Sequence, residues 1–180
     1  MKTLFLERST GESRCGDWVE KLDLDGAERI VVGTGPGSFA GIRAAIAFAQ
    51  GYRLGKPATE VKGLPSPCAI AAEGNLPLAV VGDARQGKSW IALFGADGNL
   101  EREVFQVELK EITAAVPSGY TVVSPDDRRI GDGLSAAFGE RYLGESLPTA
   151  AGLEKYAAAH PEALKDEPLP IYLNPAVRQS

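Results

Sequence analysis

The sequence predicts an α/β protein of two small lobes. Short apolar runs typical of strands alternate with longer helical segments along the 180 residues. One junction is especially informative, because a glycine-rich turn joins an apolar strand at residues 29–32 directly to a long apolar helix. With 44% hydrophobic and 24% charged residues, the chain can bury a core of its own.

The first lobe is expected over residues 1–75. Its predicted elements are strands at residues 2–6 and 29–32 and helices at residues 38–54 and 65–72. Ser38 is a good N-cap for the long helix, which Gly55 and Pro57 then end. Pro65 suits the first turn of the shorter helix. The lobe therefore consists of a small sheet with at least one long helix beside it.

The second lobe is expected over residues 76–180, after a linker at residues 75–77. Its predicted elements are strands at residues 78–81, 89–94, 104–107 and 121–123 and helices at residues 108–116 and 149–160. The turn from Gly95 to Gly98 is expected to form a hairpin between two of these strands. Pro161 stops the last helix, and Asp83 is expected to cap the turn that follows its strand.

The turn from Gly33 to Arg43 allows several interpretations. Glycine permits positive φ and close backbone approach, so the turn either wraps around a ligand or packs tightly against the chain itself. A helix N-terminus can also hold a phosphate, because its N–H groups and dipole attract anions. A P-loop is excluded, because it requires Lys followed by Ser or Thr where Phe39 and Ala40 stand.

A dinucleotide-binding turn is one alternative. Residues 35–40 satisfy the pattern G-x-G-x-x-A after a strand, and Glu60 lies at the right distance to hold a ribose hydroxyl. Pro36, however, removes one N–H donor from the turn. A dinucleotide-dependent enzyme built on Gly35, Ala40 and Glu60 therefore stays open at this point.

The string GTGPGSFAGIR resembles the signature G-x-G-P-G-S-F-T-G-[LI]-R of the bacterial threonylcarbamoyladenosine biosynthesis family TsaB, also called YeaZ. Ala40 replaces the usual Thr. The matching glycine-turn residues are Gly33, Gly35, Pro36, Gly37, Ser38, Phe39, Gly41 and Arg43. Weaker matches follow in the family's order at residues 61–64, at Asp83-Ala84-Arg85, and at Pro170-Ile171-Tyr172-Leu173, where Asn174 replaces Arg. The resemblance covers most of residues 29–175.

The chain also departs from the family pattern. The family's first strand ends in Asp-Thr-Ser, whereas this chain reads Glu7-Arg8-Ser9-Thr10. Ahead of the glycine turn the family carries a further strand and an amphipathic helix, and only residues 11–28 fill that interval here. We therefore expect the family's first helix to be absent.

The resemblance implies an actin-like or ribonuclease H-like fold with mixed sheets. It also implies a noncatalytic scaffold subunit in threonylcarbamoyl modification of tRNA. Such a subunit binds a TsaD-like catalytic subunit, a small ATPase joins the assembly, and a homodimer is a further expected form. The family's older glycoprotease name makes a peptidase a second alternative, although the sequence has few nucleophile–base pairs.

Catalytic residues are scarce in this sequence. His160 is the only histidine, so no His-x-x-x-His metal pair exists and no catalytic metal or cofactor is expected. We expect His160, at the end of a helix, to interact with the terminal carbonyls. Cys15 and Cys68 are expected to be ordinary buried thiols of a reduced, cytoplasmic protein. The segment 7–10 lacks the glycine of an actin-type phosphate hairpin, so no ATP binding is expected of this chain alone.

The net charge of −5 excludes a protein that binds nucleic acid through a broad basic surface. Strong direct tRNA binding is therefore not expected. Arg128 and Arg129 form the only local basic pair, and beside Asp126 and Asp127 they are interpreted as a solvated turn. The N-terminus lacks the apolar run of a signal peptide, and no stretch approaches membrane-spanning length.

The helix at residues 38–54 is apolar nearly all round. Between Ala40 and Tyr52 only Arg43 and Gln50 are polar, which predicts burial on more than one side. One stripe, with Ile42 and Ile46, can lie on the sheet. A second stripe of mostly small residues is predicted to bind a partner, because no first helix covers it: Ala40, Ala44, Ala47, Phe48 and Gly51. The alternative is that a neighbouring helix of the same chain covers this stripe.

Overall fold

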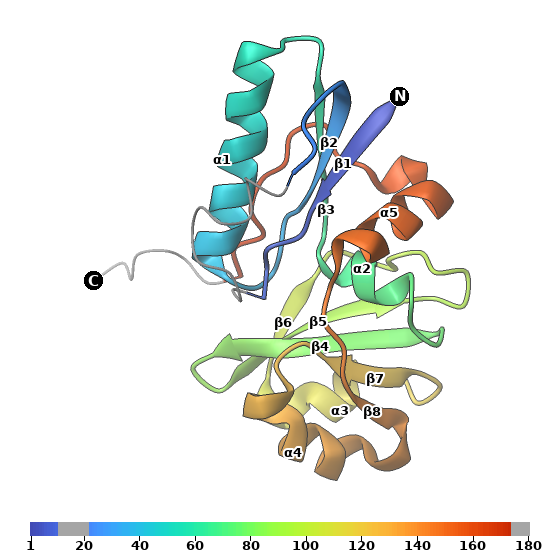
Figure 1. Ribbon diagram of the computed structural model, residues 1–180. Helices are drawn as coiled ribbons and strands as arrows, with labels where there is room; N and C mark the ends of the chain where they lie inside the picture. Colours follow the sequence, from blue (N-terminus) through green and yellow to red (C-terminus); the bar gives the residue numbers. More distant parts are fainter. Residues whose placement is uncertain (11–21, 174–180) are drawn as a thin grey trace. The chain divides into compact units, whose positions relative to one another are not determined.

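The computed structural model describes residues 1–10 and 22–173, and it divides into two compact units (Figure 1). Unit 1 contains Met1–Ala69 and Pro148–Ile171. Unit 2 contains Ile70–Leu147 and the residues from Tyr172 onward. From the sequence we predicted a second lobe over residues 76–180. The structure differs because helix α5 (Ala150–Ala159) packs on strand β1 (Lys2–Leu6) of unit 1.

Unit 1 is built on a parallel three-stranded sheet in the order β1-β2-β3. Strands β2 (Ala27–Gly33) and β1 occur where the sequence predicts them. Strand β3 (Glu60–Leu64) was not predicted, because its sequence EVKGL holds only two large apolar side chains. In the β2–β3 register Arg29 pairs with Glu60 and Gly33 with Leu64. All three strands therefore end at the same edge of the sheet.

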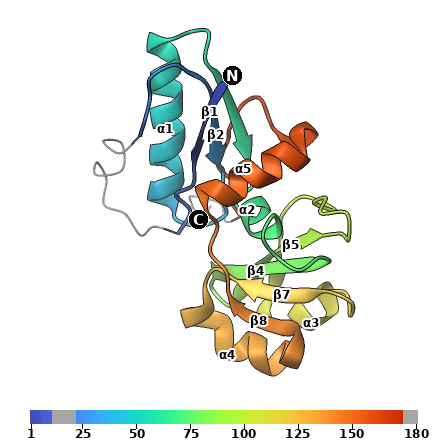
Figure 2. The same ribbon diagram turned by 45° about the vertical axis from the view of Figure 1, so that its right-hand side comes forward.

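Two longer helices complete unit 1. Helix α1 (Phe39–Gly55) packs on β2 and β3 through Ile42, Ala45, Ile46 and Ala49, which form one core with side chains of the sheet. Helix α5 lies on the opposite face, as both ribbon views show (Figure 2). Because parallel strands are buried on both faces, Ile30, Val31 and Val32 of β2 are fully buried. Helix α2 (Pro67–Ala71) follows β3.

The ends of these helices follow from local chemistry. Ser38 caps α1, because its Oγ accepts the N–H of Gly41 at 3.3 Å. Thr149 caps α5 in the same way, accepting the N–H of Gly152 at 2.8 Å. A short 3₁₀ turn, Pro161–Ala163, follows α5, where Pro161 was expected to end the helix. The predicted N-cap of α1 is thus confirmed.

Unit 2 contains a mixed five-stranded sheet in the order β6-β5-β4-β7-β8. Its strands are β4 (Leu78–Arg85), β5 (Lys88–Phe94), β6 (Phe105–Glu108), β7 (Thr121–Ser124) and β8 (Tyr142–Glu145). Strands β4, β5 and β6 are antiparallel neighbours, whereas β7 and β8 run parallel to β4. The predicted α/β class is confirmed. The Gly95–Gly98 turn connects two antiparallel segments, which are joined by a β-bridge between Phe94 and Leu100.

Helices α3 (Ile112–Ala115) and α4 (Asp127–Phe138) cover the core of unit 2. The 3₁₀ turn Leu109–Glu111 leads into α3, and the 3₁₀ turn Gly139–Arg141 follows α4. Arg128 and Arg129 are exposed to solvent, as predicted, but they lie in the first turn of α4 rather than in a loop turn. That helix buries Leu134 and Phe138, but two glycines within it masked the helical pattern.

Within residues 1–10 and 22–173, no helix has both the length and the apolar character that crossing a bilayer demands.

Candidate functional site

The glycine turn lies at the edge where the parallel strands of unit 1 end. Strand β2 ends at Gly33, β3 ends at Leu64, and the segment 7–9 continues directly from β1. In open α/β sheets this carboxyl edge is the usual place for a ligand. The contacts of the turn therefore decide between a ligand cradle and a structural connection.

The amide donors of the turn are largely used within the chain. Pro36 has no N–H, and the amides of four other residues bond internally: Thr34 to Leu64 O at 2.8 Å, Gly35 to Ser66 Oγ at 3.0 Å, Ser38 to Ser9 O at 2.5 Å, and Gly41 to Ser38 Oγ at 3.3 Å. A phosphate cradle needs these groups unpaired and aimed at the ligand. The turn is therefore a tight structural connection.

The glycines are explained by close packing against the chain itself. Gly35 has φ +87°, and a Cβ there would lie 2.5 Å from Ile42 Cδ1. Gly37 has φ +154°, and its Cβ would lie 2.7 Å from the Cβ of Ser9. A Cβ on Gly41 would overlap the carbonyl of Arg8. The turn and the segment 7–9 are thus held together at backbone contact distance.

The dinucleotide interpretation is contradicted by the position of Glu60. Residue 60 begins β3, whereas the glycine turn lies beyond the opposite ends of β2 and β3. Glu60 instead forms an ion pair with Arg29, at 2.6 Å between Oε2 and the guanidinium Nη2. No ribose held at the turn could reach this carboxylate.

Glu7 is the carboxylate nearest the turn. Its Oε1 accepts the N–H of Ser9 at 2.7 Å, and its Oε2 is buried without a hydrogen bond. Burial raises the pKa of Glu7 above its ordinary value.

A buried thiol lies in the same unit. Cys68 is 1% exposed, and burial raises the pKa of its thiol to about 12. The thiol is therefore neutral at physiological pH and cannot act as a nucleophile. This agrees with the expectation of a buried cysteine. Cys15 lies outside the described residues.

His160 does not form a catalytic constellation. Its ring lies against Tyr156, with 4.5 Å between ring centroids, and its Nδ1 is 3.5 Å from Glu162 Oε1. The side chain thus contacts a tyrosine and a carboxylate rather than the terminal carbonyls that we expected. In the part of the chain that the structure describes, no three His, Cys, Asp or Glu side chains gather as metal ligands.

The C-terminal segment ties the glycine turn to β3. Gly63 and Lys165 exchange two backbone hydrogen bonds, of 2.8 and 3.0 Å, and Lys62 pairs with Asp166. Ile171 then donates its N–H to Thr34 O at 2.9 Å. The segment at residues 170–173, which resembles a family motif, thus begins with a contact to the turn.

The third motif, Asp83-Ala84-Arg85, is a turn in unit 2. Asp83 Oδ1 accepts the N–H of Arg85 at 2.8 Å, so the expected cap is confirmed. Its Oδ2 lies 3.5 Å from the guanidinium groups of both Arg85 and Arg129. The backbone of Arg85 and Gln86 is left-handed, with φ +66° and +54°. The motif is explained by the hairpin that it forms.

The face of α1 opposite the sheet is apolar and exposed. Phe39 and Leu54 are 51% and 85% exposed. Of the predicted interface residues, Ala40, Ala47 and Gly51 are exposed, Ala44 is half-buried, and Phe48 is half-buried and packs partly against the core of unit 1. A Cβ on Gly51 would meet open space. We call these seven residues the α1 face.

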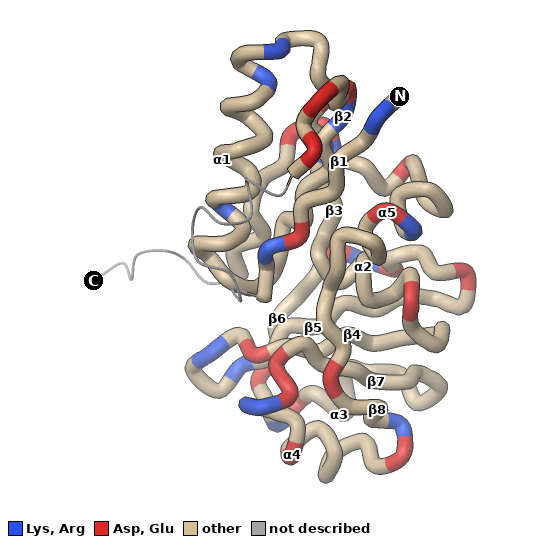
Figure 3. The backbone as a smooth tube through the Cα atoms, in the orientation of Figure 1, with Lys and Arg blue, Asp and Glu red and all other residues tan. Residues whose placement is uncertain are grey.

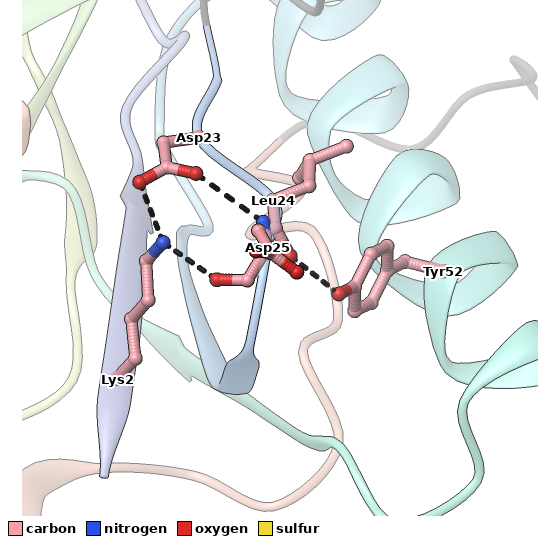
Figure 4. Close-up of polar contacts among 5 residues, drawn as sticks. All are labelled: Lys2, Asp23, Leu24, Asp25 and Tyr52. Atoms are coloured by element: carbon pink, nitrogen blue, oxygen red, sulfur yellow. Dashed lines mark hydrogen bonds and ion pairs between the residues drawn. The ribbon is translucent and has the colours of Figure 1, made fainter.

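The segment before β2 contacts one end of α1. Tyr52 donates its hydroxyl to Leu24 O at 2.8 Å, and Lys2 Nζ donates to Asp23 Oδ2 and to Asp25 O, each at 2.6 Å (Figure 4). Residues 22–26 form no helix, and β2 begins at Ala27. We expected the family's first helix to be absent from the interval at residues 11–28. Residues 11–21 of this interval lie outside the described residues.

Comparisons with known proteins identify the fold. No protein-family model matches the sequence, and no curated protein matches it. Among solved structures, YeaZ from Pseudomonas aeruginosa is similar with a TM-score of 0.65 and 21% identity, over 86% of this chain and 79% of that chain. A Pseudomonas aeruginosa protein with similarity to the peptidase YeaZ also has a TM-score of 0.65, with 19% identity, over 82% of this chain and 74% of that chain. The chain therefore shares the fold of YeaZ.

Proposed function

We propose that this protein is a noncatalytic scaffold subunit for threonylcarbamoyl modification of tRNA. In this role it binds a TsaD-like catalytic subunit through the α1 face, and a small ATPase joins the assembly. The observation that carries the proposal is the α1 face, because a set of exposed and half-buried apolar residues along one helix is typical of a protein interface. The YeaZ-like fold supports this proposal.

The glycine turn supports a scaffold more than an enzyme. Four of its amides bond within the chain, and Gly37 and Gly41 pack against Ser9 and Arg8. It therefore places the start of α1 firmly against the edge of the sheet. A rigid helix presents a more exact docking face than a loop does.

A peptidase is the less favoured function. It would need a nucleophile beside a base, or a metal-bound water. The thiol of Cys68 is buried and neutral, and His160 is occupied by Tyr156 and Glu162.

Association can be tested directly. Light scattering compares the mass of this protein alone with its mass after mixing with the TsaD-like subunit encoded in the same genome. We expect the wild type to form a complex and Ala47→Glu to fail. Burying an unpaired carboxylate at the centre of an apolar interface costs roughly 3–5 kcal/mol.

The matched control is Ala158→Glu, which places the same charge on an exposed position of α5. It should bind as the wild type does, and circular dichroism should show all three proteins folded. A wild type that ignores the subunit contradicts the proposal. Undiminished binding by Ala47→Glu would show that α1 is not the docking element.

A further inference from the structure

Glu7 lies where several segments of unit 1 meet. It follows β1 directly, and a Cβ on Gly33, at the end of β2, would overlap its Oε2. The same Cβ would lie 2.9 Å from Ser66 Oγ, in the connection from β3 to α2. Helix α2 carries the Cys68 thiol near enough to interact electrostatically with the carboxyl group. The Glu7 side chain is therefore part of the packing at this edge of the sheet.

One oxygen of this carboxyl group has no hydrogen-bond partner. Part of residue 7 reaches solvent, but Oε2 is buried without a hydrogen bond, whereas Oε1 accepts the N–H of Ser9 at 2.7 Å. The backbone of Arg8 and the hydroxyls of Ser9 and Ser66 lower the pKa of Glu7, but burial raises it by more. A buried charge costs far more than a buried neutral group. The packing therefore suits the protonated acid better than the carboxylate.

The elements packed around Glu7 supply hydroxyls and a thiol rather than a cation. The turn at residues 33–37 has no titratable side chain. Helix α2 supplies Cys68, whose thiol is neutral because its pKa is raised to about 12. Helix α5 supplies Tyr156, whose side chain hydrogen-bonds to Cys68. Among residues 1–10 and 22–173, none forms an ion pair with Glu7.

The charges of the other neighbouring segments are engaged elsewhere. Helix α1 has no Asp or Glu, and Figure 3 shows blue segments and no red along it. Its Arg43 lies over the ring of Phe39, 4.8 Å from the ring centre. On β3 and the C-terminal segment, Lys62 pairs with Asp166. An ionised Glu7 would thus be stabilised mainly by water.

The segment 7–9 is the part of this edge that can move to admit water. It lies outside β1, and Ser9 O accepts the N–H of Ser38 at 2.5 Å. Ser9 and Arg8 also press on Gly37 and Gly41. Hydrating Oε2 by moving this segment would break the bond between Ser9 and Ser38 and would leave the rest of the sheet paired.

We propose that Glu7 is a pH-dependent latch: the uncharged acid keeps the segment 7–9 closed on the glycine turn, and ionisation opens that segment locally. The proton passes to water, and the hydrated carboxylate stays with the open segment. This inference goes beyond the proposed function and does not depend on it.

The direction of the pH dependence follows from the two forms. The open form has an ordinary pKa, near 4.5, and the closed form has a raised one. Opening therefore increases as the pH rises above about 4.5 and levels off above the raised pKa, because both forms are then ionised.

The test is amide hydrogen exchange of the whole protein, followed by NMR from pH 4.5 upward and corrected for the intrinsic pH dependence of exchange. The reporter is the N–H of Ser38. Its protection should fall by up to about tenfold per pH unit in the window between the two pKa values. The N–H of Lys56, bonded to Tyr52 O at 3.0 Å at the other end of α1, is the internal control and should keep its protection.

Two variants assign the effect to Glu7. Glu7→Gln cannot ionise, so Ser38 should stay protected at every pH. Glu154→Gln, at an exposed position of α5, should reproduce the wild-type profile. A pH dependence that persists in Glu7→Gln would overturn the assignment.

The wild type alone also decides the matter, whether or not the variants fold. Constant protection of Ser38 across this pH range would show that no latch opens. A parallel loss of protection at Ser38 and Lys56 would show unfolding of the whole unit and would equally overturn the inference.

Discussion

Glu7 couples the stability of unit 1 to pH. Its pKa is raised in the folded protein by burial, so the folded state holds the proton more tightly than the unfolded chain does. The contribution of this group is complete below its unfolded pKa, near 4.5, and is lost as the pH rises through the raised folded pKa.

We therefore expect Glu7→Gln to unfold at a higher urea concentration than the wild type at neutral pH. The difference between the two should shrink as the pH falls towards 4.5, because the wild-type carboxyl is then protonated as well. Glu154→Gln, at an exposed position of α5, is the control and should leave the urea midpoint unchanged. A constant difference across this pH range would contradict the raised pKa.

Gly35 and Gly37 should not tolerate a side chain. Both have positive φ, and a Cβ at either position would press on Ile42 or Ser9. Changing either to Val should lower the free energy of unfolding by roughly 1–3 kcal/mol from backbone strain alone. Urea denaturation measures this, with Gly119→Val as the control, since a Cβ on Gly119 meets open space. Unchanged midpoints for both variants would disprove the packing described for the turn.

At the residue scale, a sequence predicts hydrogen bonds whose donor and acceptor lie close together in the chain. Ser38 was predicted as a cap because its partner, Gly41, is three residues away. The hydrogen bond from Gly35 to Ser66 spans 31 residues, and no local pattern indicates it. Whether the turn bound a phosphate or packed on its own chain could therefore not be decided from the sequence.

At the scale of elements, α1 offers a direct measure of its exposed face. A glycine inside an exposed helix costs up to about 1 kcal/mol relative to alanine. Because a Cβ on Gly51 would touch nothing, Gly51→Ala should stabilise the isolated protein by roughly that amount in thermal or urea unfolding. A loss of stability would mean that another part of the chain covers this position.

Elements were predicted well where the hydrophobic pattern is strong. Strands β4 and β5 and helix α1 have long apolar runs, and each was found within a few residues. Helix α4 and strand β8 were missed, because glycines interrupt both patterns. Strand β3 was missed because its own composition does not favour a strand. Its position in the sheet, beside β2, makes it one.

At the scale of the whole molecule, the division into units could not be predicted. Helix α5 is recognisable as a helix from its sequence, but its packing on β1 joins parts of the chain about 150 residues apart. Helix α5 also packs closely on α2, because a Cβ on Gly152 would press on the backbone of Ala69. Local patterns do not specify such a return of the chain to an earlier sheet.

The scaffold role predicts an inactive chain. Purified alone, the protein should show no threonylcarbamoyl transferase or peptidase activity and no stoichiometric zinc or iron by metal analysis. The physical reason is the single histidine, which contacts Tyr156 and Glu162, and the neutral thiol of Cys68. Co-purified metal whose removal also removes an activity would refute this.

The central claim is the role in tRNA modification, and rescue of a strain depleted of its own TsaB tests it most directly. The measurement is the threonylcarbamoyladenosine content of tRNA after expression of this protein together with its cognate TsaD-like subunit. We predict that the wild type and Ala158→Glu restore the modification and that Ala47→Glu, expressed at the same level, does not. Failure of the wild type to restore it, or equal restoration by Ala47→Glu, would contradict the account.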